Sequence, residues 1–517
     1  MEILKKRDEI KDFLKIPKIS RFIVFLHAGL AIYYSWALAF WFPSENPILF
    51  ALLLIGEIFH LWQALTYGYT VWYLNDTNQT RLVTTAPKEA LFFPAVDVFI
   101  TVAGEPLEIV EETIQAAIKI DYPKFKVFLL NDGYILKKEN WKNTISLAAK
   151  YKIRCITRKF SGGAKAGNIN NALKLTKSPL VAILDADHIP HEDFLKKTVP
   201  HFYDEKVGFV QSPQFYRNHD LNEVTRAAWE QQAVFFGAIS ISKNQTNSAT
   251  MCGTNMVIKR DALLSVGGIC QTNIAEDFLT GLFMHEKGWK SVYVPEVLAE
   301  GLAPEDIMSF SKQHFRWARG SLEVIFTYNP IWRHGLSFKQ KLQYLSSASY
   351  FLSGVVVLLN AALPIFVLFT GMRPLEMTTM DLLAIFLPYM VLTIYVLQVS
   401  TNYSVSFRAI AFAVSSFWIQ VKALNAVICG QKSKFSVTSK KKLEGNFLSV
   451  IIPHLTYVCL AIWSIYTGIS REGWSASVMS NVAWIFFNLS MFAPFIAAAL
   501  PKFNFFEKPI EQLKTAA

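Results

Sequence analysis

Long apolar runs constrain this chain more than any other feature. They fall at residues 22–42, 48–65, 344–370, 381–397, 447–469 and 482–500. Each is close to the length of about 20 residues that an α-helix needs to cross the hydrocarbon core of a bilayer. The first run is too long for a cleaved signal peptide and has no small-residue cleavage site. The sequence therefore predicts a membrane protein with about six spanning helices.

A further apolar run, at residues 407–429, fits a helix that lies in the membrane interface better than it fits a span. It contains Arg408 and Lys422, which an interfacial helix tolerates. The following residues 431–442 carry five lysines, and residues 1–15 are also rich in basic side chains. Because basic segments favour the cytoplasmic side, six spans keep both of them and both termini in the cytoplasm.

The composition excludes several other classes of protein. Apolar residues make up 52% of the chain and charged residues 18%, against about 25% charged residues in soluble proteins. The five cysteines are scattered without a C-x-x-C pair, which excludes a disulfide scaffold and a thiolate zinc cage. The basic segments near the membrane account for the net charge of +11, so nucleic acid is not an expected partner.

Between the second and third apolar runs the pattern becomes that of a folded α/β domain. Short apolar stretches at 95–102, 126–130, 153–157 and 180–184 alternate with helical patterns. This alternation predicts an open and mostly parallel sheet. Sheets of this kind bind ligands beyond the carboxyl ends of their strands.

Carboxylates follow the expected strands at those ends. Glu105 and Asp132 follow the first and second strands, and Asp185 and Asp187 follow the fourth. A single Asp-x-Asp is a weak signal, and Asp132 in Asn-Asp-Gly is also a common turn residue. Their shared edge of one sheet instead favours a divalent metal that holds a phosphorylated ligand. His188 has no metal-ligand spacing and is predicted to be structural.

A glycine-rich stretch at residues 162–168, with the sequence GGAKAGN, opens a predicted helix. Such a stretch is either a flexible loop or a turn whose backbone amides, with Lys165, lie beside a diphosphate. It lacks the G-x-x-x-x-G-K-[ST] pattern, so an ATPase-type phosphate loop is not expected.

Two later motifs are further candidates for chemistry. Glu276 and Asp277 begin an apolar helix, where acids also favour the helix dipole. Gln313, Arg316 and Trp317 share one face of a predicted helix. An arginine and a tryptophan there either anchor the chain at the membrane interface or neutralise a leaving diphosphate and stack on a flat ligand.

Taken in order, these motifs resemble the processive, membrane-integrated family-2 glycosyltransferases, and specifically the cellulose synthase catalytic subunits. The resemblance covers roughly residues 95–500. It rests on Glu105-Pro106, Asp132-Gly133, residues 165–168, Asp185-x-Asp187, Cys252-Gly253-Thr254, Glu276-Asp277, Gln313-x-x-Arg316-Trp317 and residues 435–440. The last stretch, FSVTSK, is similar to the F-x-V-T-x-K gating loop of that family.

The resemblance implies a GT-A-like domain with a donor site and an acceptor site. The implied donor contacts are Glu105, Asp132, Lys165, Asp185, Phe435, Val437, Thr438 and Lys440. Asp185 and Asp187 would hold Mg²⁺ or Mn²⁺ on the diphosphate of a UDP-sugar. Asp277 would be the general base. The implied acceptor platform is Gln313, Arg316 and Trp317, with Cys252 and Glu276 beside the acceptor.

The implied activity is inverting, processive transfer of glucose from UDP-glucose to a β-glucan that leaves through the membrane helices. The expected location is the plasma (inner) membrane, with the catalytic domain in the cytoplasm. Expected partners are the UDP-sugar donor, the growing polysaccharide and membrane lipid, and accessory export subunits are left open. The alternatives are a chitin- or hyaluronan-type synthase that uses a UDP-N-acetylhexosamine, a non-processive lipid glycosyltransferase, and a passive transporter that only binds nucleotide.

The sequence also departs from the family pattern. Residues 101–104 read TVAG in place of the usual P-T-Y-N, which puts base contacts from that loop in doubt except at Glu105. Because residues 501–517 are few, the cyclic-dinucleotide receptor domain of many relatives is expected to be absent. The expected divisions are 1–75 with two spans, 76–300 as the catalytic domain, 301–342 with the Gln-x-x-Arg-Trp helix, 343–400 with two spans, 401–446 with the interface helix and gating loop, and 447–517 with two spans and a short tail.

Overall fold

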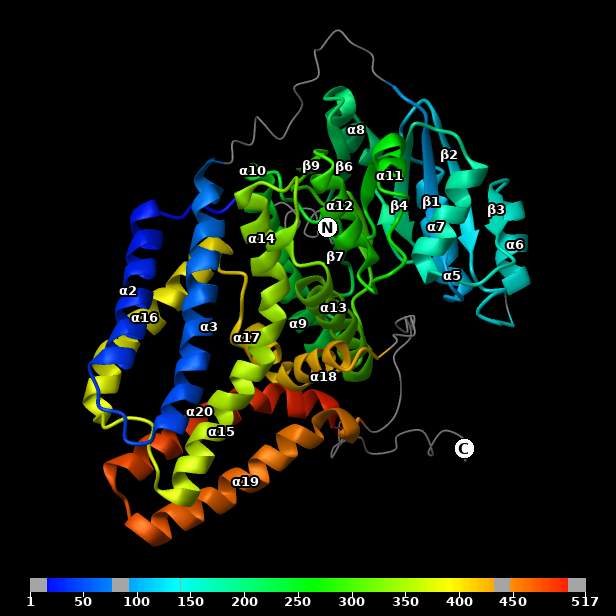
Figure 1. Cartoon of the computed structure of the whole chain (residues 1–517). Helices are drawn as coiled ribbons and strands as arrows, with labels where there is room; N and C mark the ends of the chain where they lie inside the picture. The colour runs from blue at the N-terminus through cyan, green and yellow to red at the C-terminus, as the bar shows by residue number, and fades with distance from the viewer. Residues whose placement is uncertain (1–15, 77–92, 140, 432–446, 501–517) are drawn as a thin grey trace, which may run out of the picture.

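The computed structural model describes residues 16–76, 93–139, 141–431 and 447–500 of the 517-residue chain. Figure 1 shows an α/β domain on one side of the molecule and a group of long helices on the other. The α/β domain is inserted in the sequence between the second and third long apolar helices. This is the predicted arrangement of a sheet domain within a helical membrane bundle.

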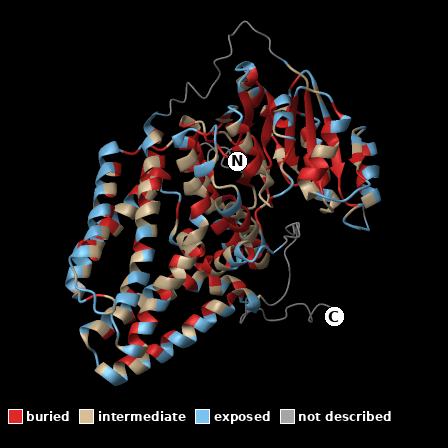
Figure 2. Ribbon diagram, viewed as in Figure 1, coloured by how far each residue is buried: buried red, intermediate tan, exposed pale blue. Residues whose placement is uncertain are grey.

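The six predicted spans are all helical. They are α2 (Arg21–Phe40), α3 (Pro47–Trp72), α15 (Ser353–Thr370), α16 (Thr379–Ser400), α19 (Leu448–Glu472) and α20 (Ala476–Ala499). Side-chain caps begin three of them: Asn46 accepts from two amides of α3, Thr378 caps α16 and Ser475 caps α20. Large apolar side chains such as Phe25 and Ile462 are exposed. Figure 2 shows exposed residues along both α2 and α19. Exposed apolar faces of this extent fit contact with lipid, and the chain is a multi-pass membrane protein.

The run at 407–429 forms two short helices, α17 (Phe407–Ser415) and α18 (Phe417–Ile428), that meet at the buried Ser416. Counted as one stretch, it brings the candidate spans of the described residues to seven. Helix α18 packs along α13 (Ile307–Thr327), which follows the α/β domain, and α17 packs on α20. The number of six spans, with 407–429 at the interface, therefore stays a prediction.

The α/β domain is built on a seven-stranded sheet with the order β3-β2-β1-β4-β8-β6-β9. Its strands are β1 (Val96–Val102), β2 (Phe125–Asn131), β3 (Arg154–Thr157), β4 (Leu180–Asp185), β6 (Val207–Gln211), β8 (Met256–Lys259) and β9 (Lys290–Tyr293). All neighbouring strands are parallel except β8, which is antiparallel to β4 and β6. The four predicted strands are thus confirmed in place and direction.

Helices cover both faces of this sheet, and a small second sheet lies beside it. The helices of the domain are α5 (Leu107–Ala117), α6 (Trp141–Lys150), α7 (Ala164–Leu175), α8 (Phe194–Thr198), α9 (Glu223–Val234), α10 (Ser240–Gln245), α11 (Arg260–Ser265) and α12 (Glu276–Glu286), of which α9 packs on the small sheet and not on the large one. The small sheet contains β5 (Ile189–Pro190), β10 (Ala299–Gly301) and β7 (Phe215–Tyr216). One buried cluster lies between the sheet and α5 and α6, and a second lies against α7 and α11. These two layers enclose the sheet between them.

Candidate active site

The parallel register of β1, β2 and β4 brings the predicted carboxylates to one edge of the sheet. Val102 of β1 lies opposite Asn131 of β2, and Thr101 lies opposite Asp185 of β4. The strands therefore end level with one another. Just beyond β1 the chain turns so that the amide of Ala103 donates to Glu105 Oε2 at 2.6 Å.

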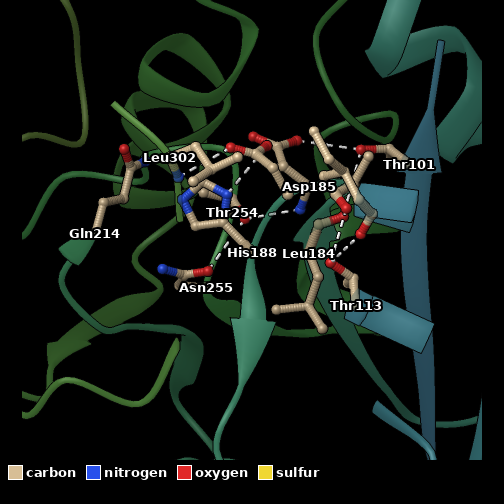
Figure 3. A network of polar contacts seen from close by, with 12 residues as sticks. Thr101, Thr113, Leu184, Asp185, His188, Gln214, Thr254, Asn255 and Leu302 are labelled. Carbon is tan, nitrogen blue, oxygen red and sulfur yellow. Dashed lines mark hydrogen bonds and ion pairs between the residues drawn. The ribbon is translucent and has the colours of Figure 1, made fainter. Parts of the chain in front are cut away.

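Asp185, Asp187 and His188 form a compact group whose potential ligand atoms all lie within 4.8 Å of one another. The amide of Leu302 donates to Asp187 Oδ2 at 3.2 Å, and His188 Nδ1 lies 3.5 Å from Asp187 Oδ1. Figure 3 shows His188 beside Asp185 at the end of β4. Neither ring nitrogen of the buried His188 has a hydrogen-bond partner among the described residues. Two carboxylates and an orphaned imidazole fit a divalent metal.

His188 was predicted to be structural from sequence, because it has no partner at ligand spacing along the chain. The structure instead places its ring against the backbone of Gly301, where an added Cβ would lie 2.5 Å from Nε2. This packing fixes the ring beside Asp187. His188 is thus a third candidate ligand that the sequence analysis missed. The available signal was that His188 is the residue immediately after Asp187 in the sequence.

Lys165 lies between the metal candidates and the loop that carries Gly253. Its Nζ donates to Asp185 Oδ1 at 2.5 Å and to the carbonyl oxygen of Gly253 at 2.8 Å. Burial opposes the charged ammonium, but Asp185 and then Glu276 raise the pKa of Lys165 above its usual value. Burial alone would raise the pKa of Asp185, and the charge of Lys165 lowers it. Both side chains are therefore held charged in the site.

Asp132 is buried and pairs with an arginine that the sequence analysis did not single out. Arg158 Nε and Nη2 donate to its two carboxylate oxygens, each at 2.7 Å. Asp132 therefore lies at the end of β2 with a bond from Arg158 on each carboxylate oxygen. A direct contact between Asp132 and the nucleotide stays untested.

Glu276 and Asp277 are the first two residues of α12, as the helix-dipole interpretation requires. Asp277 has a further neighbour, because a Cβ added to Gly253 would lie 2.8 Å from its Oδ2. Burial, and then the charge of Asp277, raises the pKa of Glu276 to about 7. Burial also raises the pKa of Asp277. Cys252, which precedes Gly253, is half-buried, and its amide donates to Gln211 Oε1 at 2.9 Å.

Helix α13 supplies the third side of the site through Gln313, Arg316 and Trp317, all half-buried. Burial lowers the pKa of Arg316, and the charges of Glu276 and Asp185 oppose that shift. The guanidinium is therefore close enough to interact with the carboxylates of α12 and β4. Trp317 packs on the ring of His314, with their centroids 5.1 Å apart.

The structure thus gathers residues from β4, α7, α12 and α13 whose positions in the sequence are far apart. The expected gating-loop contacts Phe435, Val437, Thr438 and Lys440 lie outside the described residues. Their roles stay predictions.

Two family models match this arrangement along the chain. Glycosyltransferase like family 2 matches residues 94–320, and Cellulose synthase matches residues 265–497. Together the two models cover residues 94–497, so the chain is similar to the family-2 glycosyltransferases and to the cellulose synthases. These matches confirm the predicted resemblance and the predicted enzyme class.

Individual relatives extend the likeness. The chain is 28% identical to the cellulose synthase catalytic subunit (UDP-forming) of Pseudomonas fluorescens over 94% of its own length and 67% of the relative. It is 32% identical to the subunit of the same description from Xanthomonas axonopodis pv. citri over 65% of its length and 47% of the relative. For cellulose synthase 2 of Novacetimonas hansenii the identity is 29%, over 88% of this chain but only 29% of the relative. The chain thus spans less than half of two of these relatives.

A solved structure confirms the fold. A mannosyltransferase from Pyrobaculum calidifontis, in complex with GDP-Man and Mn²⁺, superposes with a TM-score of 0.53 at 17% identity. The match covers 74% of this chain and all of the other. The catalytic domain therefore has the predicted GT-A-like fold.

Proposed function

We propose that this glycosyltransferase is a processive, inverting enzyme that polymerises glucose from UDP-glucose into a β-glucan and passes the product across the membrane. The observation that supports it most is the convergence of Asp277, Arg316 and the Asp185 group on one site. The similarity to UDP-forming cellulose synthase subunits along almost the whole chain supports the donor and the product.

The chain's own side chains divide the reaction between them. Asp277 accepts the proton of the acceptor hydroxyl as that oxygen attacks the anomeric carbon. Arg316 and Lys165 balance the negative charge that develops on the departing diphosphate. Trp317 holds the acceptor sugar by its flat C–H face. A divalent metal, held by Asp185, Asp187 and His188, would neutralise charge on the diphosphate when bound.

The substrate is tested with purified protein in lipid vesicles, Mg²⁺ and a panel of labelled UDP-sugars. We expect UDP-glucose to give a polymer that β-glucan-specific glycosidases degrade, and the choice of enzyme reports a 1,3 or a 1,4 linkage. Polymer from UDP-N-acetylglucosamine would instead favour a chitin- or hyaluronan-type synthase. Single-sugar transfer to lipid would contradict processivity, and no sugar release from any UDP-sugar would favour a passive transporter.

We expect the membrane topology to place the catalytic domain in the cytoplasm, on the side of the lysine-rich segment. In a variant without the native cysteines, Cys at Ser44 or Ser475 should react with an impermeant thiol reagent added to intact cells. Cys at Ser439 should react only after the cells are permeabilised. The native Cys429 and Cys459 are exposed in the structure and must be removed first. Labelling at Ser439 from outside would contradict the six-span arrangement.

Gly253→Ala is expected to lower transfer by about 10²-fold, the cost of a small displacement of reacting groups. Gly253 has φ +79°, and the added Cβ would press on Asp277 Oδ2. A matched control is Gly288→Ala, since Gly288 has φ +81° but nothing within 4 Å of the added Cβ. Both variants carry the same backbone strain, and only the first displaces Asp277. The measurement is the initial rate of transfer by each folded variant. If both variants lost the same activity, backbone strain alone would explain the effect.

A further inference from the structure

Arg158 occupies a position in the donor site that the proposed mechanism does not use. It follows β3 directly and is buried, with 9% of its surface exposed. Besides its two bonds to Asp132, its Nη2 donates to the carbonyl oxygen of Ala164 at 2.7 Å, and its Nη1 donates to that of Gly162. One guanidinium therefore joins the end of β2 to the glycine-rich loop before α7.

That loop has a conformation that ordinary residues rarely adopt. Gly162, Gly163 and Ala164 all have positive φ, at +134°, +66° and +43°. Ala164 has a side chain, so the last of these is strained and needs surrounding structure to hold it. The carbonyl groups on both sides of Gly163 are turned toward Arg158, which supplies that support.

The space around the contact is closed. A Cβ added to Gly167 would lie 2.1 Å from the oxygen of Gly162 and 2.4 Å from Arg158 Nη1. The backbone of residues 162–164 is therefore packed closely against α7 at Gly167. The bonds from the Arg158 guanidinium hold it in this conformation. Lys165 follows Ala164 directly and reaches Asp185 with its Nζ. Arg158 holds the carbonyl groups of Gly162 and Ala164, and Lys165 is the next residue of the chain. A displacement of Arg158 is therefore expected to displace the Lys165 ammonium as well.

We propose that Arg158 is a positioning residue for the diphosphate of the donor, and that Asp132 holds Arg158 in place for this role. The planar guanidinium of Arg158 donates one hydrogen bond to each carboxylate oxygen of Asp132. A lysine ammonium cannot reproduce this bidentate geometry. This inference rests on the proposed nucleoside-diphosphate donor and adds the residues that shape its phosphate site.

The test measures calorimetric affinities for UDP and UMP, in Mg²⁺, on detergent-solubilised full-length protein. Arg158→Lys and Asp132→Asn are each expected to weaken UDP about tenfold and to weaken UMP much less, because the displaced loop faces the second phosphate. The double variant should be no weaker than either single variant, as expected for two residues that act as one unit. A merely structural role would weaken both nucleotides alike.

Two further outcomes would overturn the proposal. One is that Asp132→Asn weakens UDP and UMP equally while Arg158→Lys binds as the wild type does, which would make Asp132 a direct base contact. The other is additive losses in the double variant. If the buried pair proves necessary for folding, Gly167→Ala disturbs the same loop and leaves both charges in place. It should show the same selective loss for UDP, and equal losses would again contradict the proposal. A wild-type protein that binds another nucleoside diphosphate but not UDP would contradict only the proposed donor, and the same variants then test the loop with that nucleotide.

Discussion

Asp277→Asn is expected to leave UDP-glucose binding within a few-fold of the wild type while lowering transfer by about 10²–10⁴-fold, the usual contribution of a general base. Asparagine keeps the size of the side chain and can still accept from the amide of Phe278, which donates to Asp277 Oδ1 at 2.7 Å. It cannot take up a proton at neutral pH. Calorimetric affinity and polymer formed per minute, measured on the same preparation, separate binding from transfer.

The competing interpretation is that the charge of Asp277 only stabilises α12 by its interaction with the helix dipole at the N-terminus. A charge at that place is worth about 0.3–1 kcal/mol of helix stability, which would leave the rate almost unchanged. Asp261→Asn is a matched control, since Asp261 lies exposed in the first turn of α11. We expect it to keep wild-type transfer. If Asp277→Asn behaved like this control, Asp277 would not be the base, and joint loss of binding and folded protein would make it structural.

The framework of the site could be predicted because it depends on local patterns. Strand β4 is buried from Leu180 to Leu184, and such strands read as unbroken apolar runs. The carboxylates after it then fall at the sheet edge whatever the rest of the domain does. The spans were equally readable, because crossing a bilayer requires a length and a polarity that few other elements have.

The rest of the site depends on contacts between distant segments, which no local pattern contains. Arg158 and Asp132 are 26 positions apart and meet only because β2 and β3 are parallel neighbours. Gly253 reaches Asp277 because β8 returns antiparallel beside β4, a strand that the alternating pattern did not predict. The break between α17 and α18 at Ser416 was also not predictable from local patterns, because the sequence on both sides of it is apolar and helical.

Asp187→Ala is expected to abolish measurable transfer, and so is treatment of the wild type with EDTA, reversibly with Mg²⁺ or Mn²⁺. Asp187 is only 2% exposed, and its carboxylate lies within 4.8 Å of the ligand atoms of Asp185 and His188, so the alanine variant removes one of three candidate ligands. The diphosphate would then lose most of its charge compensation, because Lys165 and Arg316 are shared with the carboxylates of the site.

Asp187→Asn separates the ligand role from a structural one. The amide side chain keeps the volume and can still accept the bond from the amide of Leu302, so the fold should survive. Its neutral oxygen is a weaker ligand, because hard divalent cations prefer carboxylates. We therefore expect Asp187→Asn to bind UDP only weakly in Mg²⁺ and to regain part of its activity as the metal concentration rises. A wild type that keeps full activity in EDTA would rule the metal out, and an Asp187→Asn variant with wild-type metal dependence would move the ligand role from Asp187 to Asp185 and His188.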